Sequence, residues 1–397
     1  IHYWLVNMRG GEKVVEALLD LYPDADIFTH VVDEDSISSK IARRIKGTTF
    51  IQKLPKAKRF YPMYLPLMPL ALEQLDLHEY DLILSSESGP AKGVITSPNS
   101  LHICYCHSPM RYVWDMYHDY YQHSSWLKKL FMPWLLHRLR LWDLASSFRV
   151  DYFIANSSFV QKRINKFYRR DSEVIYPPIN TADFYIADQV GDYYLMVGQL
   201  VAYKNTHLAV EAFNENGKLL VIVGTGAELE DLRRLAKDNI QFLGYQGFTE
   251  IKRYYAECKA LIFPGVEDFG MVPVEAMASG RPVIALGEGG ALDTVVDSVT
   301  GMLYEKNTVD AVLKLKNEGY HIMGIEQADK SSKLNDFTLA NEPIAIVMGN
   351  EVKGVSQEVI DICDEVIEIP QFGTKHSLNI SVTTGIVIWE LWRKMNA

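Results

Sequence analysis

Cysteine is scarce in this sequence, long apolar runs are absent, and positive charge is not in excess. The cysteines are Cys104, Cys106, Cys258 and Cys363. They show neither CxxC nor CxxxH spacing, which argues against a disulfide scaffold and against a zinc site, and we expect a reducing, cytoplasmic setting. No run approaches the roughly 20 apolar residues of a membrane-spanning helix. The formal net charge of −10 gives no reason to expect RNA as a partner.

The composition is that of an ordinary globular protein. Hydrophobic residues make up 48% and charged residues 23%, which argues against disorder. At 397 residues the chain has room for two or three domains of about 100–200 residues each. The chain opens with IHYWLV and no methionine. We therefore expect residues 1–6 to be the end of a first strand whose beginning lies upstream.

Short apolar strands alternate with amphipathic helices up to about residue 307, a pattern that predicts parallel sheets covered by helices on both faces. VIYPPINTADFY at 174–185 has paired prolines and no helical period, so we expect an extended linker there. The expected organisation is an α/β protein with three parts. These are a first α/β domain at 1–180, a second α/β domain at 181–307 and a different segment at 308–397.

The segment PGVEDFGMVPVEAMASG at 264–280 contains two glutamates with seven residues between them. Glu267 follows an expected strand and Glu275 lies on an expected helix. The residues between them stand at the helix N-terminus, where free N–H groups favour an anion. Lys204 follows another strand, at the sheet edge where ligands bind in open α/β sheets. A diphosphate flanked by carboxylates fits this pattern, although two spaced glutamates and one lysine also occur by chance.

The wider segment PGVEDFGMVPVEAMASGRPVIAL resembles the signature of the retaining glycosyltransferases of family 4, which have the GT-B architecture of two facing Rossmann-like domains. Further segments agree in the family's order: MRGGEKVVEAL at 8–18, YCHSPMRYVWD at 105–115, VIYPPINTADF and GTGAEL. The resemblance extends over about residues 1–307 and points toward bacterial mannosyltransferases.

The resemblance implies specific roles for the residues that match the family's motifs. His107 and Glu267 would be catalytic, His107 near the transferred sugar and Glu267 on the sugar's hydroxyls. Lys204 would neutralise the departing diphosphate and Glu275 would bind the ribose. The implied donor-binding set is Gly10, Gly11, Gln199, Lys204, Phe269, Gly270, Met271, Val272 and Glu275. Gln199 stands where the family often has arginine, and on the residues alone His107 could equally be structural.

No metal and no cofactor is implied for this reaction, since the leaving diphosphate assists the attack. The D-x-D spacing from Asp24 to Asp26 is interpreted as turn chemistry. The expected substrates are GDP-mannose or another sugar nucleotide and a glycan or lipid-linked acceptor. Two basic-aromatic stretches, 53–70 and 126–142, leave two interpretations open: peripheral contact with the inner face of a membrane, or ordinary packing.

The last 90 or so residues have a different character. GNEVKG, IPQFG and SLN, in this order before an apolar helix, resemble the C-terminal part of SPOUT-type, TrmH-like RNA 2′-O-methyltransferases. The resemblance covers about 309–397 and implies a partial α/β knot. It implies contacts to S-adenosylmethionine from Gly349, Asn350, Glu351, Gly354, Ile369, Ser377, Leu378 and Asn379.

The earlier motif of that methyltransferase family, with an asparagine and an arginine, is missing, because glycosyltransferase sequence fills its place. We therefore interpret the chain as a chimera of two truncated enzymes that meet near 304–315. The expected function is hexosyl transfer. The alternatives are a tRNA or rRNA 2′-O-methyltransferase, which is not expected to be active, and a non-catalytic nucleotide-sugar binder or GT-B epimerase.

Overall fold

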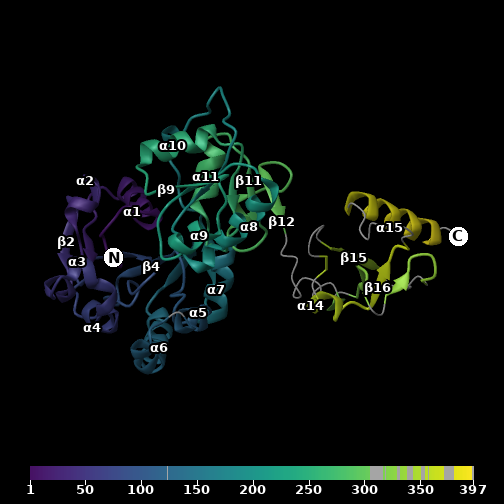
Figure 1. The fold of residues 1–397 in the computed structure, drawn as a ribbon. Coiled ribbons are helices and arrows are strands. Elements are labelled where there is room, and N and C mark those ends of the chain that lie inside the picture. Colours follow the sequence, from purple (N-terminus) through teal and green to yellow (C-terminus); the bar gives the residue numbers. More distant parts are fainter. Residues whose placement is uncertain are drawn as a thin grey trace. The chain divides into compact units, whose positions relative to one another are not determined.

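The computed structural model divides into two compact units, Ile1–Tyr304 and Glu305–Ala397, shown in Figure 1. It describes residues 1–122, 124–304, 316–317, 319–328, 331–337, 343–349, 354–355, 357–370 and 380–395. Each unit is described by itself below.

The first part of the Ile1–Tyr304 unit contains two parallel sheets, ordered β1-β2 and β3-β4-β5-β6. Its strands are β1 Ile27–Thr29, β2 Ile45–Thr48, β3 Leu82–Glu87, β4 Leu101–Cys106, β5 Tyr152–Ala155 and β6 Ser172–Val174. Its helices are α1 Gly10–Leu21, α2 Ser39–Ala42, α3 Ala57–Phe60, α4 Met68–Leu72, α5 Tyr117–Gln122, α6 Trp126–Ser147 and α7 Ser158–Tyr168. His2 forms bridges to both Thr29 and Ser86, so residues 1–5 run between the two sheets.

The second part of this unit is a six-stranded parallel sheet, ordered β12-β11-β10-β7-β8-β9. Its strands are β7 Tyr194–Val197, β8 Leu220–Val223, β9 Ile240–Gly244, β10 Leu261–Phe263, β11 Val283–Leu286 and β12 Gly301–Tyr304. Its helices are α8 Thr206–Asn216, α9 Leu229–Leu235, α10 Phe248–Glu257, α11 Met271–Ala278 and α12 Ala291–Thr294. Short 3₁₀ helices connect the elements: η1 Glu34–Ser36, η2 Phe50–Lys53, η3 Tyr61–Leu67, η4 Thr181–Asp183 and η5 Ala202–Lys204.

Strand β8 shows why this sequence gives a sheet covered on both faces. All four of its residues, LVIV, are buried. Val221 and Val223 pack in one core with residues of α10 and α11. Leu220 and Ile222 pack in a second core with residues of α8 and α9. Successive side chains of a strand point to opposite faces, so a strand apolar at every position needs helices on both sides.

The Glu305–Ala397 unit has its own parallel sheet, ordered β14-β16-β13-β15. The elements are β13 His321–Ile325, β14 Ser332–Lys333, β15 Ile344–Met348, α14 Gln357–Ile360, β16 Glu365–Glu368 and α15 Ile380–Met395. Val387 and Leu391 of α15 pack on Met323 and Ile367 of the sheet. The sequence TVDAVLKLKNEG at 308–319 predicts a helix, but it lies almost wholly outside the described residues. The α/β class with parallel sheets is confirmed in both units.

Candidate active site

A central cleft of about 660 Å³ lies in the Ile1–Tyr304 unit, with walls from both of its parts. Its lining brings together most of the residues that the sequence singled out. These are Gly10, Gly11, His107, Gln199, Lys204, Glu267, Phe269, Gly270, Met271 and Val272. They come from segments up to 262 residues apart along the chain, so the fold, not local sequence, makes the cluster.

One wall of the cleft consists of loops at the carboxyl ends of parallel strands. Gln199 and Lys204 follow β7, Gly224 and Gly226 follow β8, and Glu267 follows β10. The loops touch closely: a Cβ on Gly224 would come within 1.8 Å of the Gly198 carbonyl oxygen. Only glycine fits such an approach. This edge of a parallel sheet is where open α/β proteins bind ligands.

Helix α11 begins at Met271 and directs its N-terminus at the cleft. Gly270 precedes it with φ +86°, a left-handed conformation that glycine adopts without strain. The opposite wall carries the N-terminus of α1: a Cβ on Gly10 would lie 3.4 Å from Met271 Cγ. Two helix N-termini therefore meet in the cleft, and each offers free N–H groups and a positive dipole end.

Lys204 and Glu267 form an ion pair in the cleft. Their side chains are 15% and 18% exposed, so the pair is shielded but within reach of a ligand. An anion arriving at the N-terminus of α11 can attract Lys204, which frees the Glu267 carboxylate to accept hydrogen bonds from hydroxyl groups.

Glu275 does not line the cleft. Its Oε1 accepts a hydrogen bond from Lys13 Nζ at 3.1 Å, and its Oε2 accepts one from the Tyr255 hydroxyl at 2.9 Å. Lys13 comes from α1, so this carboxylate connects the two parts of the unit. A ribose at Glu275 would have to take the place of the Lys13 ammonium.

His107 lies directly after β4 and its ring lines the cleft. Its backbone N–H donates to the Glu87 carbonyl oxygen at 2.7 Å, and its Nε2 lies 2.8 Å from Ser86 Oγ. Burial, with a smaller contribution from His2, lowers the pKa of His107 to about 3. The ring is therefore neutral at neutral pH, and it reaches the cleft instead of the core.

Arg111 and Asp268 also line the cleft, and the sequence analysis did not single them out. Arg111 Nε donates to Asp268 Oδ2 at 2.9 Å, and Arg163 donates to Oδ1 at 2.8 Å. Asp268 directly follows Glu267, whereas Arg111 stands in the quoted segment YCHSPMRYVWD. Their partnership spans 157 residues, and no local pattern signals it.

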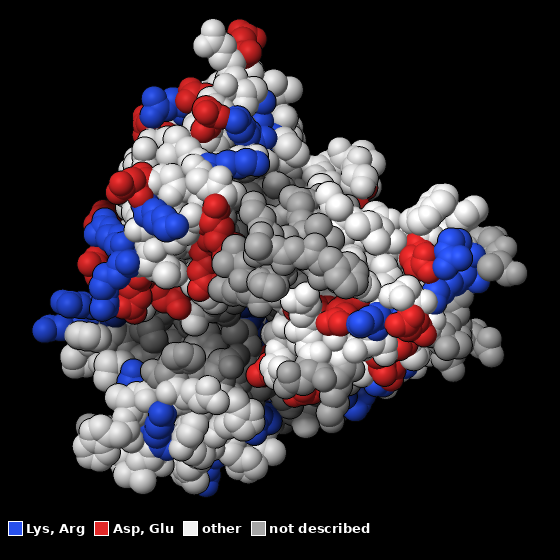
Figure 2. Space-filling model, turned by 45° about the vertical axis from the view of Figure 1, so that its right-hand side comes forward, with Lys and Arg blue, Asp and Glu red and all other residues white. Residues whose placement is uncertain are grey.

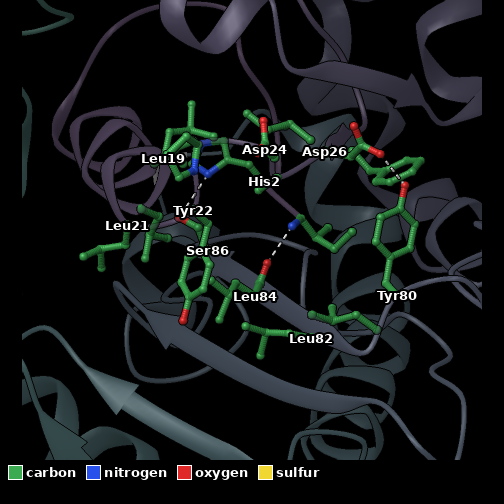
Figure 3. A pocket seen from close by; sticks show the side chains of 18 of the residues that line it. His2, Leu19, Leu21, Tyr22, Asp24, Asp26, Tyr80, Leu82, Leu84 and Ser86 are labelled. Atoms are coloured by element: carbon green, nitrogen blue, oxygen red, sulfur yellow. Dashed lines mark hydrogen bonds between the residues drawn. The ribbon is translucent and has the colours of Figure 1, made fainter.

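A second, mostly apolar pocket of about 500 Å³ lies between α1, β1 and β3 (Figure 3). At its wall His2 Nδ1 lies 3.0 Å from Ser86 Oγ, and the Ile1 amine donates to the Leu84 carbonyl oxygen at 2.6 Å. Asp26 accepts a hydrogen bond from Tyr80 at 2.7 Å, and Asp24 pairs with Arg44 at 2.9 Å. Within the described residues, no group of three or more His, Cys, Asp or Glu side chains is placed to hold a metal ion.

In the Glu305–Ala397 unit, Gly349, Gly354 and Ile369 are described, whereas Asn350, Glu351, Ser377, Leu378 and Asn379 lie outside the described residues. Gly349 and Gly354 pack backbone to backbone, since a Cβ on Gly349 would lie 2.6 Å from the Gly354 carbonyl carbon. Gly354 has φ +67°, and the next N–H, of Val355, donates to Glu326 at 2.7 Å. A side chain at Gly349 would not fit this close approach, and one at Gly354 would strain its left-handed backbone.

Two exposed apolar stretches project from the Ile1–Tyr304 unit. In α6, Trp126, Leu130, Phe131 and Trp134 are exposed, and η3 exposes Met63. The lowest part of the molecule in Figure 2, where Figure 1 places α6, is mostly white with a few blue side chains. None of the helices that the structure describes is long and apolar enough to cross a membrane.

Comparison with family models gives three matches. Residues 8–183 match the model of Glycosyltransferase Family 4, and residues 187–318 match that of glycosyl transferases group 1. Residues 294–389 match the SpoU rRNA methylase family. The second and third matches overlap at 294–318, the region where the sequence analysis places the meeting of two families.

Three curated relatives illustrate the two kinds of match, two of them to glycosyltransferases and one to a methyltransferase. The O-antigen chain mannosyltransferase RfbU of Salmonella typhimurium is 30% identical over 42% of this chain and 48% of its own length. A GDP-mannose-dependent phosphatidylinositol monomannoside mannosyltransferase of Mycobacterium tuberculosis is 37% identical over 24% and 29%. A tRNA (guanosine(18)-2′-O)-methyltransferase of Aquifex aeolicus is 38% identical over 22% and 41%. The chain thus spans less than half the length of each of these relatives.

Two solved structures share the fold. Sucrose-phosphate synthase from Thermosynechococcus elongatus superposes with a TM-score of 0.55 at 19% identity, over 80% of this chain and 89% of that one. Anabaena Alr3699/HepE superposes with a TM-score of 0.53 at 18% identity, over the same shares. At these identities the likeness shows the GT-B fold alone.

Proposed function

Residues 8–318 of this chain belong to the family 4 glycosyltransferases, and on that premise we propose that the central cleft transfers a hexose from a sugar nucleotide to a glycan or lipid-linked acceptor. The donor we propose is GDP-mannose. The Salmonella and Mycobacterium relatives are both mannosyltransferases by name, and this supports the choice.

The observation that carries the proposal is the meeting of two helix N-termini beside Lys204. Helices α1 and α11 both begin at the cleft, and Gly10 of α1 lies beside Met271 of α11. Their N–H groups and the Lys204 ammonium give a diphosphate three sources of positive potential. In this scheme Gln199 offers a neutral hydrogen bond where a charged one would contribute about 1.5–3 kcal/mol.

The other proposed roles follow from the distances. Glu267, released from Lys204 when the diphosphate binds, accepts hydrogen bonds from the donor sugar's hydroxyls. Glu275 takes the ribose hydroxyls in exchange for Lys13. His107, neutral and at the end of β4, contacts the transferred sugar.

The chemistry that fits this site is a front-face displacement with retention. The acceptor hydroxyl attacks the anomeric carbon on the face from which the diphosphate leaves. The carbon–oxygen bond to the diphosphate breaks, the glycosidic bond forms, and the hydroxyl proton passes to the departing phosphate oxygen. The protein positions both substrates and stabilises the developing negative charge with Lys204 and the helix N-termini.

The test is a transfer assay with radiolabelled GDP-mannose, UDP-glucose and UDP-N-acetylglucosamine, with lipid extract and soluble glycans as acceptors. Glu267→Gln should abolish transfer. Glu230→Gln, at an exposed glutamate that pairs with Arg233, is the matched control and should not. Release of free sugar without transfer would instead identify a hydrolase and formation of an epimer an epimerase, whereas nucleotide-sugar binding without any product would identify a non-catalytic binder.

A second candidate function is binding of S-adenosylmethionine by the Glu305–Ala397 unit. The observation that favours it is the close backbone approach of Gly349, at the carboxyl end of β15, to Gly354, within the SpoU match. Because that family's earlier motif is missing, we propose that this unit does not catalyse methylation. Calorimetric titration with S-adenosylmethionine, followed by a methylation assay on tRNA, tests both statements.

A further inference from the structure

His107 lies at the cleft end of a row of polar side chains. No sequence motif predicted that these side chains would lie next to one another. His107 Nε2 lies 2.8 Å from Ser86 Oγ, and Ser86 Oγ lies 3.0 Å from His2 Nδ1. His2 Nε2 in turn lies 3.7 Å from Glu12 Oε1. His2, Glu12 and Ser86 are each at most 2% exposed. Figure 3 shows His2 and Ser86 directed at each other.

Glu12 determines which atoms donate and which accept in the hydrogen bonds of this row. It stands in the first turn of α1, where the helix dipole favours a carboxylate, and its Oε2 accepts the Arg9 N–H at 2.9 Å. A distance of 3.7 Å is too long for a hydrogen bond, but a buried carboxylate at that range still favours an N–H over a lone pair on His2 Nε2. Among the described residues, His2 Nε2 has no hydrogen-bond partner.

The protons of the row can then be placed. Burial lowers the pKa of His2, so its ring is neutral and carries one N–H. With that N–H on Nε2, Nδ1 is an acceptor and takes the Ser86 hydroxyl proton in a hydrogen bond. The Ser86 oxygen is then free to accept from His107, which requires the N–H of His107 to be on Nε2.

We propose that Glu12, His2 and Ser86 are positioning residues that hold His107 in its Nε2–H tautomer, so that Nδ1 accepts a hydrogen bond from a substrate hydroxyl. This role rests on the proposed function, since it requires a hydroxyl-bearing substrate in the cleft. His107 then acts as a fixed acceptor and not as a proton donor.

The packing of α1 holds the row in place. A Cβ on Gly11 would lie 2.8 Å from the Tyr3 hydroxyl, 3.4 Å from His2 Cε1 and 3.6 Å from His107 Nε2. The first turn of α1 therefore lies beside both histidines, with the Tyr3 hydroxyl as its closest neighbour. On the other side, the backbone N–H of His107 donates a hydrogen bond to the carbonyl oxygen of Glu87, at the end of β3.

The decisive measurement is the tautomer of His107, read from the ring-nitrogen chemical shifts of histidine-labelled protein and assigned with His107→Gln. We expect the Nε2–H form in the unaltered chain and in Ser86→Thr, and a mixture of both forms in Ser86→Ala. Turnover in Ser86→Ala should fall about tenfold while donor affinity changes less than about twofold, because orientation is lost and binding is not.

Ser85→Ala is the matched control. Ser85 is the buried neighbour on β3, and its Oγ lies 2.9 Å from His102 Nε2, so the variant removes an equivalent serine–histidine contact away from the cleft. It should leave the His107 tautomer and turnover unchanged. An Nδ1–H form in the unaltered chain, or the same tautomer in Ser86→Ala, would overturn the proposal. If no donor supports transfer, the proposed function fails, and the spectra still decide the tautomer.

Discussion

At the scale of single residues, we expect the ion pair of Lys204 and Glu267 to determine how strongly the cleft binds an anion. Replacing Lys204 by Met should weaken donor binding and slow transfer together. One charge-assisted contact of about 1.5–3 kcal/mol is lost, which corresponds to roughly 10- to 150-fold in kcat/KM. Steady-state kinetics and nucleotide titration measure both. Lys162→Met, at an exposed position of α7, is the control; equal kinetics in the two variants would remove Lys204 from the site.

Gly10 and Gly11 are neighbours on α1 with different surroundings. A Cβ at position 11 would approach the Tyr3 hydroxyl to 2.8 Å, whereas one at position 10 would make an ordinary 3.4 Å contact with Met271. We expect Gly11→Ala to lower turnover about tenfold or more by displacing the Tyr3 ring, whose centroid lies 4.1 Å from that of the His2 ring. Gly10→Ala should stay within about threefold. Both substitutions favour the helix by up to about 1 kcal/mol, so thermal melts separate stability from catalysis.

Buried histidines make the stability of the chain depend on pH. Burial lowers the pKa of His30 and of His102 to about 4, from 6.5. Between those values the unfolded state binds more protons than the folded state. The unfolding free energy should therefore fall as the pH drops from about 6.5 to about 4. Glu87, whose pKa is raised by burial, opposes this trend.

Urea denaturation at several pH values in that window tests the expectation. His30→Gln should flatten the dependence, while substitution of the exposed His78 should leave its slope as it was. A slope that is identical in all three proteins would contradict the assignment.

At the scale of elements, α6 has an apolar surface that the core does not use. Trp126, Leu130 and Trp134 follow one another at i, i+4 and i+8 and are 63–75% exposed. This spacing puts them on one face of the helix, and the guanidinium of Arg138 lies over the Trp134 ring, 4.7 Å from its centroid. We expect the chain to co-sediment with vesicles that contain anionic lipid. The double variant Trp126→Ser, Trp134→Ser should lose this binding, while Leu292→Ser, at an exposed leucine of α12, should keep it.

The sequence predicted the elements best where apolar runs were long and flanked by turn residues. The apolar runs at 219–226 and 260–265 predict strands that contain β8 and β10, and the helix predicted over 272–280 overlaps α11, which begins one residue earlier. β2 and β16 were missed, and both are short and polar: IKGT in β2 and EVIE in β16. β16 is nevertheless an inner strand, because β14 and β13 pair with its two edges. Such strands form because of the strands that pair with them, and those partner strands lie far away along the chain.

In the candidate site, too, local motifs predicted some residues, whereas contacts between distant parts of the chain could not be predicted. Motifs predicted that His107, Lys204 and Glu267 would matter, and the fold brings all three to one cleft. The link from Glu275 to Lys13 crosses 262 residues, and the row from Glu12 to His107 needs three-dimensional proximity. Neither leaves a local pattern, so spacing and composition could not reveal them.

At the scale of the whole molecule, two compact units predict two unfolding transitions. A nucleotide at about 100 times its dissociation constant should stabilise the transition of the Ile1–Tyr304 unit by about 2.7 kcal/mol and leave the other in place. Calorimetry with GDP, UDP and S-adenosylmethionine tests this. A shift of both transitions with GDP would show that the units unfold together, and a shift of the smaller unit with S-adenosylmethionine would show a methyl-donor site there.

Asp268 has a mechanical consequence for the catalytic cycle. It directly follows Glu267, and Arg111 and Arg163 hold its carboxylate from the opposite part of the unit. The loop after β10, which lines the cleft, is therefore tied to the other part of the unit. Any opening wide enough to admit a new nucleotide must either break this tether or pull the loop away from the departing product. Opening and product release would then be a single event, with its rate set by two guanidinium groups outside the reacting bond.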